Sequence, residues 1–215
     1  MTIPFSLFLA LASYIIGSIN GAIIISRLVY KDDVRKHGSN NAGLTNFLRT
    51  YGKKSAPFVL AIDILKTAVP VFLSGLLFAQ FLDFASAEER VLIGRALGGM
   101  FAMLGHCYPL FSGLKGGKAV LSGGTAVLFI SPPIFGILLL VFLVAVILTR
   151  YISLGSVLAA FSFPVSAFFF GLPLIVNIFA LLYATLLIAK HHGNIARLVK
   201  GQERKLSFKG SQEGK

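Results

Sequence analysis

The chain has 215 residues, of which 56% are hydrophobic and only 13% are charged, and its mean hydropathy is +0.83. A water-soluble domain rarely combines so little charge with so much Leu, Ile, Val and Phe, so the composition excludes an ordinary soluble protein and predicts an integral membrane protein. The single cysteine, Cys107, excludes an intrachain disulfide. The net charge of +12 would suit a nucleic-acid partner, but the basic residues flank apolar runs, which favours a membrane surface and no nucleic acid.

Seven apolar segments can be drawn along the chain, each followed by a polar or turn-forming stretch. Each segment is predicted to be a helix, because lipid offers no partner for an unpaired backbone polar group. The first segment has no basic residue before it, so we expect it to be retained as a span and not cleaved as a signal peptide. The chain is predicted to be a single membrane domain, 1–215, with a flexible basic tail at about 204–215. The segments are 3–25, 56–82, 91–105, 119–131, 134–149, 153–170 and 174–190.

The basic residues predict how these segments cross the membrane. If successive connections alternate between sides, every Lys and Arg except Lys66, Arg90 and Arg95 lies on one side or at its border. Cytoplasmic connections carry the excess of Lys and Arg in membrane proteins. The sequence therefore predicts an all-α fold of seven transmembrane helices with the N-terminus outside and the C-terminus in the cytoplasm.

Residues 38–49, the first loop, form the most polar stretch of the cytoplasmic side. The run GSNNAGLTNFLR offers hydroxyls, amides, two glycines and Arg49, which together could surround an anion. Arg49 could hold a phosphate or carboxylate with two hydrogen bonds, or it could simply end a helix with its charge in water. Asp32, Asp33 and Lys36, just before the loop, are expected to form a solvated face.

Residues 105–118, the second loop, end in the sequence KGGK. Gly116 and Gly117 would let the backbone approach a phosphate, while Lys115 and Lys118 neutralise it. The next apolar segment starts here, so the amide groups of its first turn would face the same anion. On its own, KGGK is also typical of a flexible basic turn.

Residues 190–203, the third segment, carry His191 and Asn194. These two residues are three apart and are predicted to share a helix face. A histidine here can also be a helix C-terminal residue that interacts with the helix dipole, and His192 fits that role better than His191 does.

Ionisable residues also occur inside the apolar segments. Asp63 and Lys66 are spaced to pair on one helix face, either as a structural pair or beside a polar site. Arg95 is expected to reach toward the membrane surface from near a helix end. No carboxylate cluster has metal-ligand spacing and no Gly-x-Ser-x-Gly elbow occurs, which disfavours metal catalysis and a serine acyl-enzyme.

Taken together, the three polar stretches resemble the bacterial acyl-phosphate:glycerol-3-phosphate acyltransferases, the PlsY family. The resemblance covers nearly the whole chain and includes Asp33-Val34-Arg35, the first loop, Asp63-Ile64-Leu65-Lys66, the second loop, Arg150-Tyr151-Ile152-Ser153, His191-His192-Gly193-Asn194-Ile195 and Glu203.

The resemblance implies a seven-span enzyme of the bacterial inner membrane with its active site facing the cytoplasm. It implies transfer of a fatty acyl group from acyl phosphate to the 1-hydroxyl of sn-glycerol 3-phosphate, giving lysophosphatidic acid and phosphate as the first step of phospholipid synthesis. No cofactor and no metal are implied, and the partners would be the two substrates and membrane lipid, with the chain monomeric. Such enzymes lack the His-x4-Asp motif of other acyltransferases, and none occurs here.

The same resemblance assigns the site residues. We expect Ser39, Arg49 and Lys118 to hold the acyl-phosphate head, the Gly116-Gly117 backbone to bind glycerol 3-phosphate, and His191 and Asn194 to orient the attacking hydroxyl or the phosphate. The residues expected to be catalytic are Ser39, Arg49, Lys118, His191 and Asn194. Those expected to bind substrate are Asn41, Gly43, Thr45, Asn46, Lys115, Gly116, Gly117 and Ser153.

Some positions depart from the family pattern. Asn40 and Ala119 stand where the family usually has glycine, and Ser122 stands where it has threonine. Asn40 could still adopt a left-handed backbone, which Asn tolerates better than most residues. These departures put substrate affinity in question more than the reaction type.

Two questions stay open on the sequence alone. The proton acceptor could be His191, or it could be the phosphate of the substrate itself, with His191 as a hydrogen-bond donor; the resemblance favours the second route. A small anion transporter or channel is the alternative function, because basic loops and the Asp63–Lys66 pair could serve one, although the polar residues gather on one side. A membrane scaffold without activity is a third reading.

Overall fold

A computed structural model describes residues 2–206, and every regular element in that range is a helix. The fold class expected from the sequence, all-α, is therefore confirmed for these residues. The helices are α1 (Thr2–Gly17), α2 (Gly21–Tyr30), α3 (Leu44–Tyr51), α4 (Ala56–Phe81), α5 (Ala87–Cys107), α6 (Val120–Ile130), α7 (Pro132–Thr149), α8 (Ile152–Phe169), α9 (Leu174–Lys190) and α10 (His192–Val199), with short 3-10 helices η1 (Val34–Lys36) and η2 (Leu110–Ser112).

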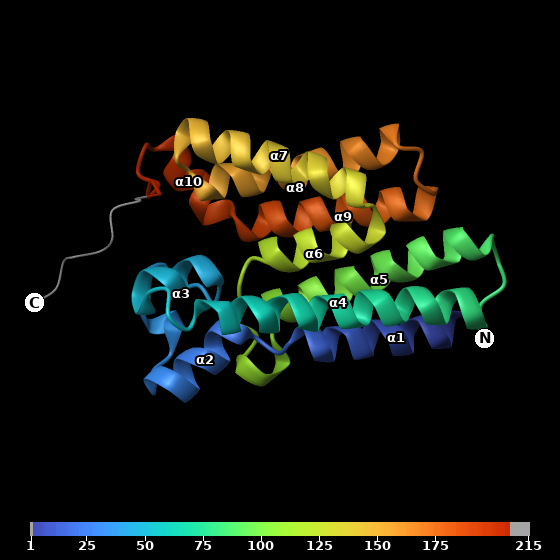
Figure 1. The fold of residues 1–215 in the computed structure, drawn as a ribbon, viewed down its shortest axis with the longest axis horizontal. Helices are drawn as coiled ribbons and strands as arrows, with labels where there is room; N and C mark the ends of the chain where they lie inside the picture. The colour runs from blue at the N-terminus through green and yellow to red at the C-terminus, as the bar shows by residue number, and fades with distance from the viewer. Residues whose placement is uncertain (1, 207–215) are drawn as a thin grey trace, which may run out of the picture.

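The long helices form two layers with α6 between them. Helices α1, α4 and α5 lie side by side in one layer, and α7, α8 and α9 form the other (Figure 1). The short helices α3 and α10 lie at the same end of this bundle, α3 beside the first layer and α10 beside the second (Figure 1). Many large apolar side chains point outward, Leu148 with 77% and Phe169 with 78% exposure among them, as expected for helices whose outer surface meets lipid.

The first apolar segment is two helices, because the chain bends at residues 18–20. A Cβ placed on Gly17 would lie 2.4 Å from the Ala102 carbonyl oxygen, so only glycine lets α1 approach α5 this closely. Asn20 then starts α2 by accepting a hydrogen bond from Ile23 N at 3.0 Å. As a result, α2 continues to Tyr30, beyond the predicted end at residue 25, and delivers the chain to the first loop.

Helix α6 is too short to cross a bilayer alone. Its 11 residues give a length of about 16 Å, against about 30 Å for the hydrocarbon core. It ends at Ile130 and α7 begins at Pro132, so the break predicted at residues 131–133 is the single residue Ser131. Arg95 Nη1 donates to the carbonyl oxygen of Phe129 in the last turn of α6 at 2.6 Å. Arg95 was expected to reach toward the membrane surface; its guanidinium group instead bonds to a carbonyl at the end of α6 that has no partner within its own helix.

All seven apolar segments are helical, but fewer of them satisfy a length and hydropathy test for crossing a membrane. In the described range, five helices or helix pairs pass it, or six if α9 and α10, which bend by 60°, count as one broken span. The structure thus supports five or six spans. It does not decide the predicted number of seven or the predicted sides of the two termini. Most of the predicted tail, about 204–215, lies outside the described residues.

Candidate active site

A cavity of about 790 Å³ opens between the two helix layers near α3 and α10. Its mouth is lined by the first loop, by Lys118, and by residues 202–204 after α10. Its interior is lined by apolar side chains of α6, α7, α8 and α9, such as Phe129, Leu138 and Phe163. One side of the cavity is therefore polar and basic, and the other resembles a hydrocarbon core.

Ten of the thirteen residues predicted for the site line this cavity together. They come from four separate parts of the chain, which the fold brings to one mouth. These residues are Ser39, Asn41, Gly43, Thr45, Asn46, Arg49, Lys118, Ser153, His191 and Asn194. Lys115, Gly116 and Gly117 are not among the lining residues of the described cavity.

The first loop is held together by Asn46, whose side chain is 1% exposed. Its amide nitrogen lies 3.0 Å from the carbonyl oxygens of Val34, His37 and Asn41, and its amide oxygen accepts from Ser39 N at 2.9 Å. The side-chain amide of Asn46 already bonds to the backbone of the loop. In this conformation Asn46 is therefore better suited to stabilising the loop than to binding a substrate.

Asn40, the departure noted in the first loop, has φ of 54°. This left-handed backbone is the conformation expected for it, so that prediction is confirmed. Asn tolerates the conformation at a modest energetic cost, and the loop keeps its turn without glycine.

Arg49 projects from α3 onto the cavity wall. Its side chain is exposed, and within the described residues it donates no hydrogen bond to the protein. The hydroxyl groups of Ser39 and Thr45 line the same mouth and are also exposed. Three donors of the first loop are thus free to meet an anion, in contrast to the internally bonded Asn46.

Lys118, which lines the same cavity, is part of a polar network. Lys118 Nζ donates to Asn194 Oδ1, and Asn194 Nδ2 donates to Glu203 Oε1 at 2.6 Å. Burial lowers the pKa of Lys118 to about 8, and the nearby Glu203 carboxylate offsets only part of that effect. Among residues 2–206, the one lysine that lines the cavity therefore loses its charge closer to neutral pH than an exposed lysine would.

Glu203, although it belongs to the resemblance, was not predicted as a site residue, and it lines the cavity. Its carboxylate accepts from Ser153 Oγ at 2.8 Å and from Arg197 Nε at 2.7 Å, besides Asn194. Burial by itself would raise the pKa of Glu203, but these hydrogen bonds lower it overall. Glu203 lies beyond α10, and no local spacing relates it to Ser153. The only sequence signal for it was that Glu203 belongs to the motifs on which the family resemblance rests.

His191 lies at the junction of α9 and α10 and is 3% exposed. Its Nδ1 atom is 2.8 Å from the Leu187 carbonyl oxygen, which can only accept, so Nδ1 carries a proton. In the neutral ring, Nε2 is then the atom free to accept a proton or a hydrogen bond. His192, in contrast, is exposed and bonds to the carbonyl of Ala189, as expected for a helix-terminal histidine.

Beneath the mouth, Asp63 and Lys66 form the predicted ion pair, with 2.7 Å between Asp63 Oδ1 and Lys66 Nζ. His106 joins them, since its Nδ1 lies 2.8 Å from Lys66 Nζ. All three side chains are at most 5% exposed, and Asp63 and His106 line the cavity floor. A buried pair that is also hydrogen-bonded fits the interior of a helix bundle.

Gly116 and Gly117 pack against the start of their own loop. Gly116 N donates to Cys107 O at 3.3 Å and Gly117 N donates to His106 O at 3.1 Å. A Cβ on Gly117 would lie 2.0 Å from His106 Nε2. Both amide groups are thus occupied in this conformation, and the structure gives the glycines a packing role that the sequence did not predict.

Comparison with known proteins shows which family the chain matches. Residues 7–201 match the family model described as glycerol-3-phosphate acyltransferase. The chain belongs to the glycerol-3-phosphate acyltransferase family. A member from Finegoldia magna is 37% identical over 211 residues, covering 96% of this chain and 98% of that protein. A member from Listeria monocytogenes is 36% identical over 200 residues, covering 93% and 96%.

Two solved structures of the family have the same fold. The glycerol 3-phosphate form of PlsY, an integral membrane glycerol 3-phosphate acyltransferase, has a TM-score of 0.82 and 33% identity, covering 94% of this chain and 96% of that one. Its lysophosphatidic acid form has a TM-score of 0.79 and 32% identity, covering 94% and 95%. The chain is therefore a membrane-embedded acyltransferase of this family, as the resemblance implied.

Proposed function

We propose that this protein transfers a fatty acyl group from an acyl phosphate to the 1-hydroxyl of sn-glycerol 3-phosphate. The products are lysophosphatidic acid and inorganic phosphate. The observation that carries the proposal is the division of the cavity, with Arg49 and Lys118 at a polar mouth and an apolar interior behind them. An acyl phosphate has the same division, and the similar proteins in glycerol 3-phosphate and lysophosphatidic acid forms support the acceptor and the product.

In this proposal the mouth binds both phosphate groups. Arg49 and Lys118 supply positive charge from opposite sides, and Ser39, Thr45 and Ser153 supply hydroxyl groups. Lys115 would attract the anionic substrates from the solvent side, where its side chain is exposed. Gly43 and Asn41 shape the first-loop wall, and Gly116 and Gly117 keep Lys118 in place instead of holding glycerol 3-phosphate themselves.

The reaction needs no covalent enzyme intermediate, because an acyl phosphate is already an activated anhydride. The hydroxyl oxygen forms a bond to the acyl carbonyl carbon, and the bond from that carbon to the phosphate oxygen breaks. The cationic side chains stabilise the charge that develops on the departing phosphate, and positioning of the two substrates supplies much of the rate.

The hydroxyl proton passes either to the phosphate of the substrate or to His191 Nε2. Because Nδ1 donates to Leu187, Nε2 of the neutral ring can accept the hydroxyl proton, whereas in the phosphate route His191 would have to be protonated for Nε2 to donate a hydrogen bond. A His191→Gln variant separates them. Turnover near that of the unmodified protein with an unchanged pH dependence would leave the phosphate as proton acceptor.

We also propose that the protein is a monomer of the bacterial inner membrane, with seven membrane helices, α1 and α2 being one of them and α6 a partial crossing. The N-terminus would lie outside and the cavity mouth would face the cytoplasm, where the basic residues gather. Single cysteines at Asp83 and Lys53, in a Cys107→Ser background, test this orientation. A membrane-impermeant thiol reagent should label intact cells carrying Asp83→Cys and not those carrying Lys53→Cys; the reverse pattern would refute it.

The activity itself is tested by incubating purified protein with acyl phosphate and radiolabelled glycerol 3-phosphate, without added metal ion or coenzyme A. Formation of labelled lysophosphatidic acid is the expected result, and its absence would refute the proposed function. The same preparation in sealed vesicles tests the anion-transport alternative. Phosphate movement without acyl transfer would favour that alternative.

A further inference from the structure

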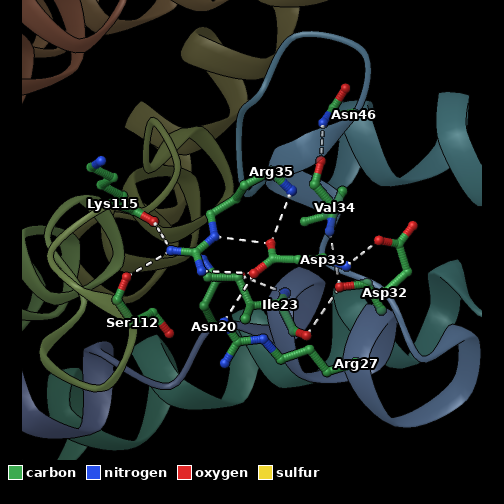
Figure 2. Close-up of polar contacts among 11 residues, drawn as sticks. Asn20, Ile23, Arg27, Asp32, Asp33, Val34, Arg35, Asn46, Ser112 and Lys115 are labelled. Carbon is green, nitrogen blue, oxygen red and sulfur yellow. Dashed lines mark hydrogen bonds and ion pairs between the residues drawn. The ribbon is translucent and has the colours of Figure 1, made fainter.

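The clearest contact outside the cavity that involves the active-site loops is made by Arg35. Figure 2 shows its guanidinium group between Asp33 on one side and the second loop on the other. Arg35 Nε and Nη2 lie 2.9 and 2.7 Å from the two carboxylate oxygens of Asp33. Arg35 Nη1 donates to the carbonyl oxygens of Ser112 at 2.6 Å and Lys115 at 3.1 Å.

The carboxylate fixes this guanidinium group in place. Asp33 also accepts from Arg35 N at 3.0 Å and from Arg27 Nη2 at 2.9 Å. The hydrogen bonds from Arg35 keep the pKa of Asp33 well below its usual range. The two acidic residues were expected to form a solvated face; for Asp33, with 13% of its side chain exposed, that expectation is wrong.

The part of the second loop that Arg35 contacts is a turn with two backbone hydrogen bonds of its own, from Ser112 N and Leu114 N to the Pro109 carbonyl oxygen. Leu110, Phe111 and Leu114 are 52–63% exposed, so their burial contributes little to its position. Gly113 and Leu114 both have positive φ, and a leucine rarely adopts that backbone unless its surroundings impose it. Among residues 2–206, hydrogen bonds to residues 109–116 from outside the second loop come from Arg35 alone.

Arg35 also connects the second loop to the first. Its neighbour Val34 is fully buried, and the Val34 carbonyl accepts one of the hydrogen bonds of Asn46 (Figure 2). Asn46 in turn holds the backbone of the first loop. A short path of hydrogen bonds therefore runs from the loop that carries Arg49, through residues 34 and 35, to the loop that ends in Lys118.

We infer that Arg35 is a positioning residue for the acyl transfer, which fixes the second loop so that Lys118 stands opposite Arg49 across the cavity mouth. It acts through the loop backbone, since its guanidinium group is not among the groups lining the cavity. The inference rests on the proposed function for its kinetic consequence, but the contact itself can be tested without activity.

The test compares Arg35→Gln and Arg35→Lys with Arg27→Gln in the purified full-length protein. Arg27 is the matched control, because it bonds to the same Asp33 oxygen but makes no hydrogen bond to the second loop in the described structure. Lysine keeps the charge of Arg35, but its single nitrogen lacks the planar fork that holds both Asp33 oxygens while Nη1 reaches the second loop. Both Arg35 variants should therefore lose the contact.

The first measurement is amide hydrogen exchange over residues 109–118. Exchange should rise in both Arg35 variants and stay unchanged in Arg27→Gln. The second measurement is the pair of KM values for acyl phosphate and glycerol 3-phosphate. At least one KM should rise by about tenfold or more in the Arg35 variants, whereas a purely structural loss would lower only the apparent kcat by reducing the active fraction.

Each outcome decides the inference. Unchanged exchange in the Arg35 variants would refute the contact, and increased exchange with both KM values within twofold of the unmodified protein would refute the positioning role. Normal kinetics of Arg35→Lys would show that only the charge of Arg35 matters, which would also refute the positioning role. If the unmodified protein makes no lysophosphatidic acid, the proposed function fails, while the exchange data still show whether Arg35 holds the second loop.

Discussion

The first loop and the second loop meet at the same cavity mouth but are stabilised in different ways. The first loop is held mainly by the buried side chain of Asn46, one of its own residues, which bonds to Ser39 N and Asn41 O; Asn20 Nδ2 adds one hydrogen bond from outside, to the Ala42 carbonyl oxygen at 3.1 Å. The second loop is tied to its own start through Gly116 and Gly117, but its outer part is held by Arg35, which lies 77 residues from Ser112 in the chain. The Asn46 network leaves the Ser39 and Arg49 side chains free to donate, whereas the position of Lys118 depends in part on Arg35, which lies outside its own loop.

The largest expected effect comes from removing a free donor of the first loop. Arg49→Ala should lower kcat/KM by about 100-fold or more, because a charge-assisted phosphate contact is lost while the scaffold of the loop remains. Steady-state acyl transfer measures this effect, and an unchanged melting temperature shows that the loop is intact. Lys53→Ala, which removes an exposed charge just beyond α3, is the control. Full activity of Arg49→Ala would contradict the assignment.

A second variant removes the scaffold of the first loop and leaves its donors. Asn46→Ala should lower the free energy of unfolding by about 2 kcal/mol, because buried carbonyl groups and the Ser39 amide lose their partner. The KM values should rise as well, because Asn46 holds the backbone that positions both Ser39 and Arg49. Thermal unfolding in detergent and substrate titration measure both effects.

The control for Asn46 is Asn177→Ala. Asn177 bonds to the carbonyls of Leu172 and Pro173 at the start of α9 and does not line the cavity. Its loss should lower the melting temperature and leave both KM values unchanged. If Asn46→Ala behaves in the same way, Asn46 does not shape the first loop for substrate binding.

The charge of Lys118 gives the pH dependence of the second loop. Its pKa is lowered to about 8, chiefly by burial, so Lys118 is charged below that pH and becomes neutral as the pH rises through it. The kcat/KM of the free enzyme should therefore fall about tenfold per pH unit above pH 8 if the charge is essential. Lys118→Arg should move this decline upward, and rates must be corrected for spontaneous acyl phosphate hydrolysis. An unchanged decline in Lys118→Arg would assign it to another group.

The smallest expected effect concerns Ala119, directly after Lys118. Its φ is 58°, in the left-handed region, although its side chain is 1% exposed. Ala119→Gly should raise the free energy of unfolding by up to about 1 kcal/mol, because glycine adopts this backbone without strain. Ala126→Gly, inside α6, should lower it by about the same amount. A destabilising Ala119→Gly would show that its Cβ packing outweighs the strain.

The local parts of this protein follow from its sequence. Apolar runs specify helices in lipid whatever their neighbours are, and all seven predicted segments are helical in the structure. Asp63 and Lys66 pair because residues three apart share a helix face. The three polar stretches, including the left-handed Asn40, could also be recognised from their own residue pattern.

Only the tertiary structure decided which of these polar residues are free to bind a substrate and which hold the loops in place. Whether an amide such as Asn46 faces a substrate or its own loop depends on which carbonyl groups surround it. Glu203 reaches Ser153, and Arg35 reaches Ser112, across long stretches of chain. Hydrogen bonds between residues far apart in sequence depend on how the helices pack, and neither composition nor spacing encodes them. The sequence therefore determined the helices and the polar residues of the site, and the packing determined which of those residues are free to bind and which hold the others in place.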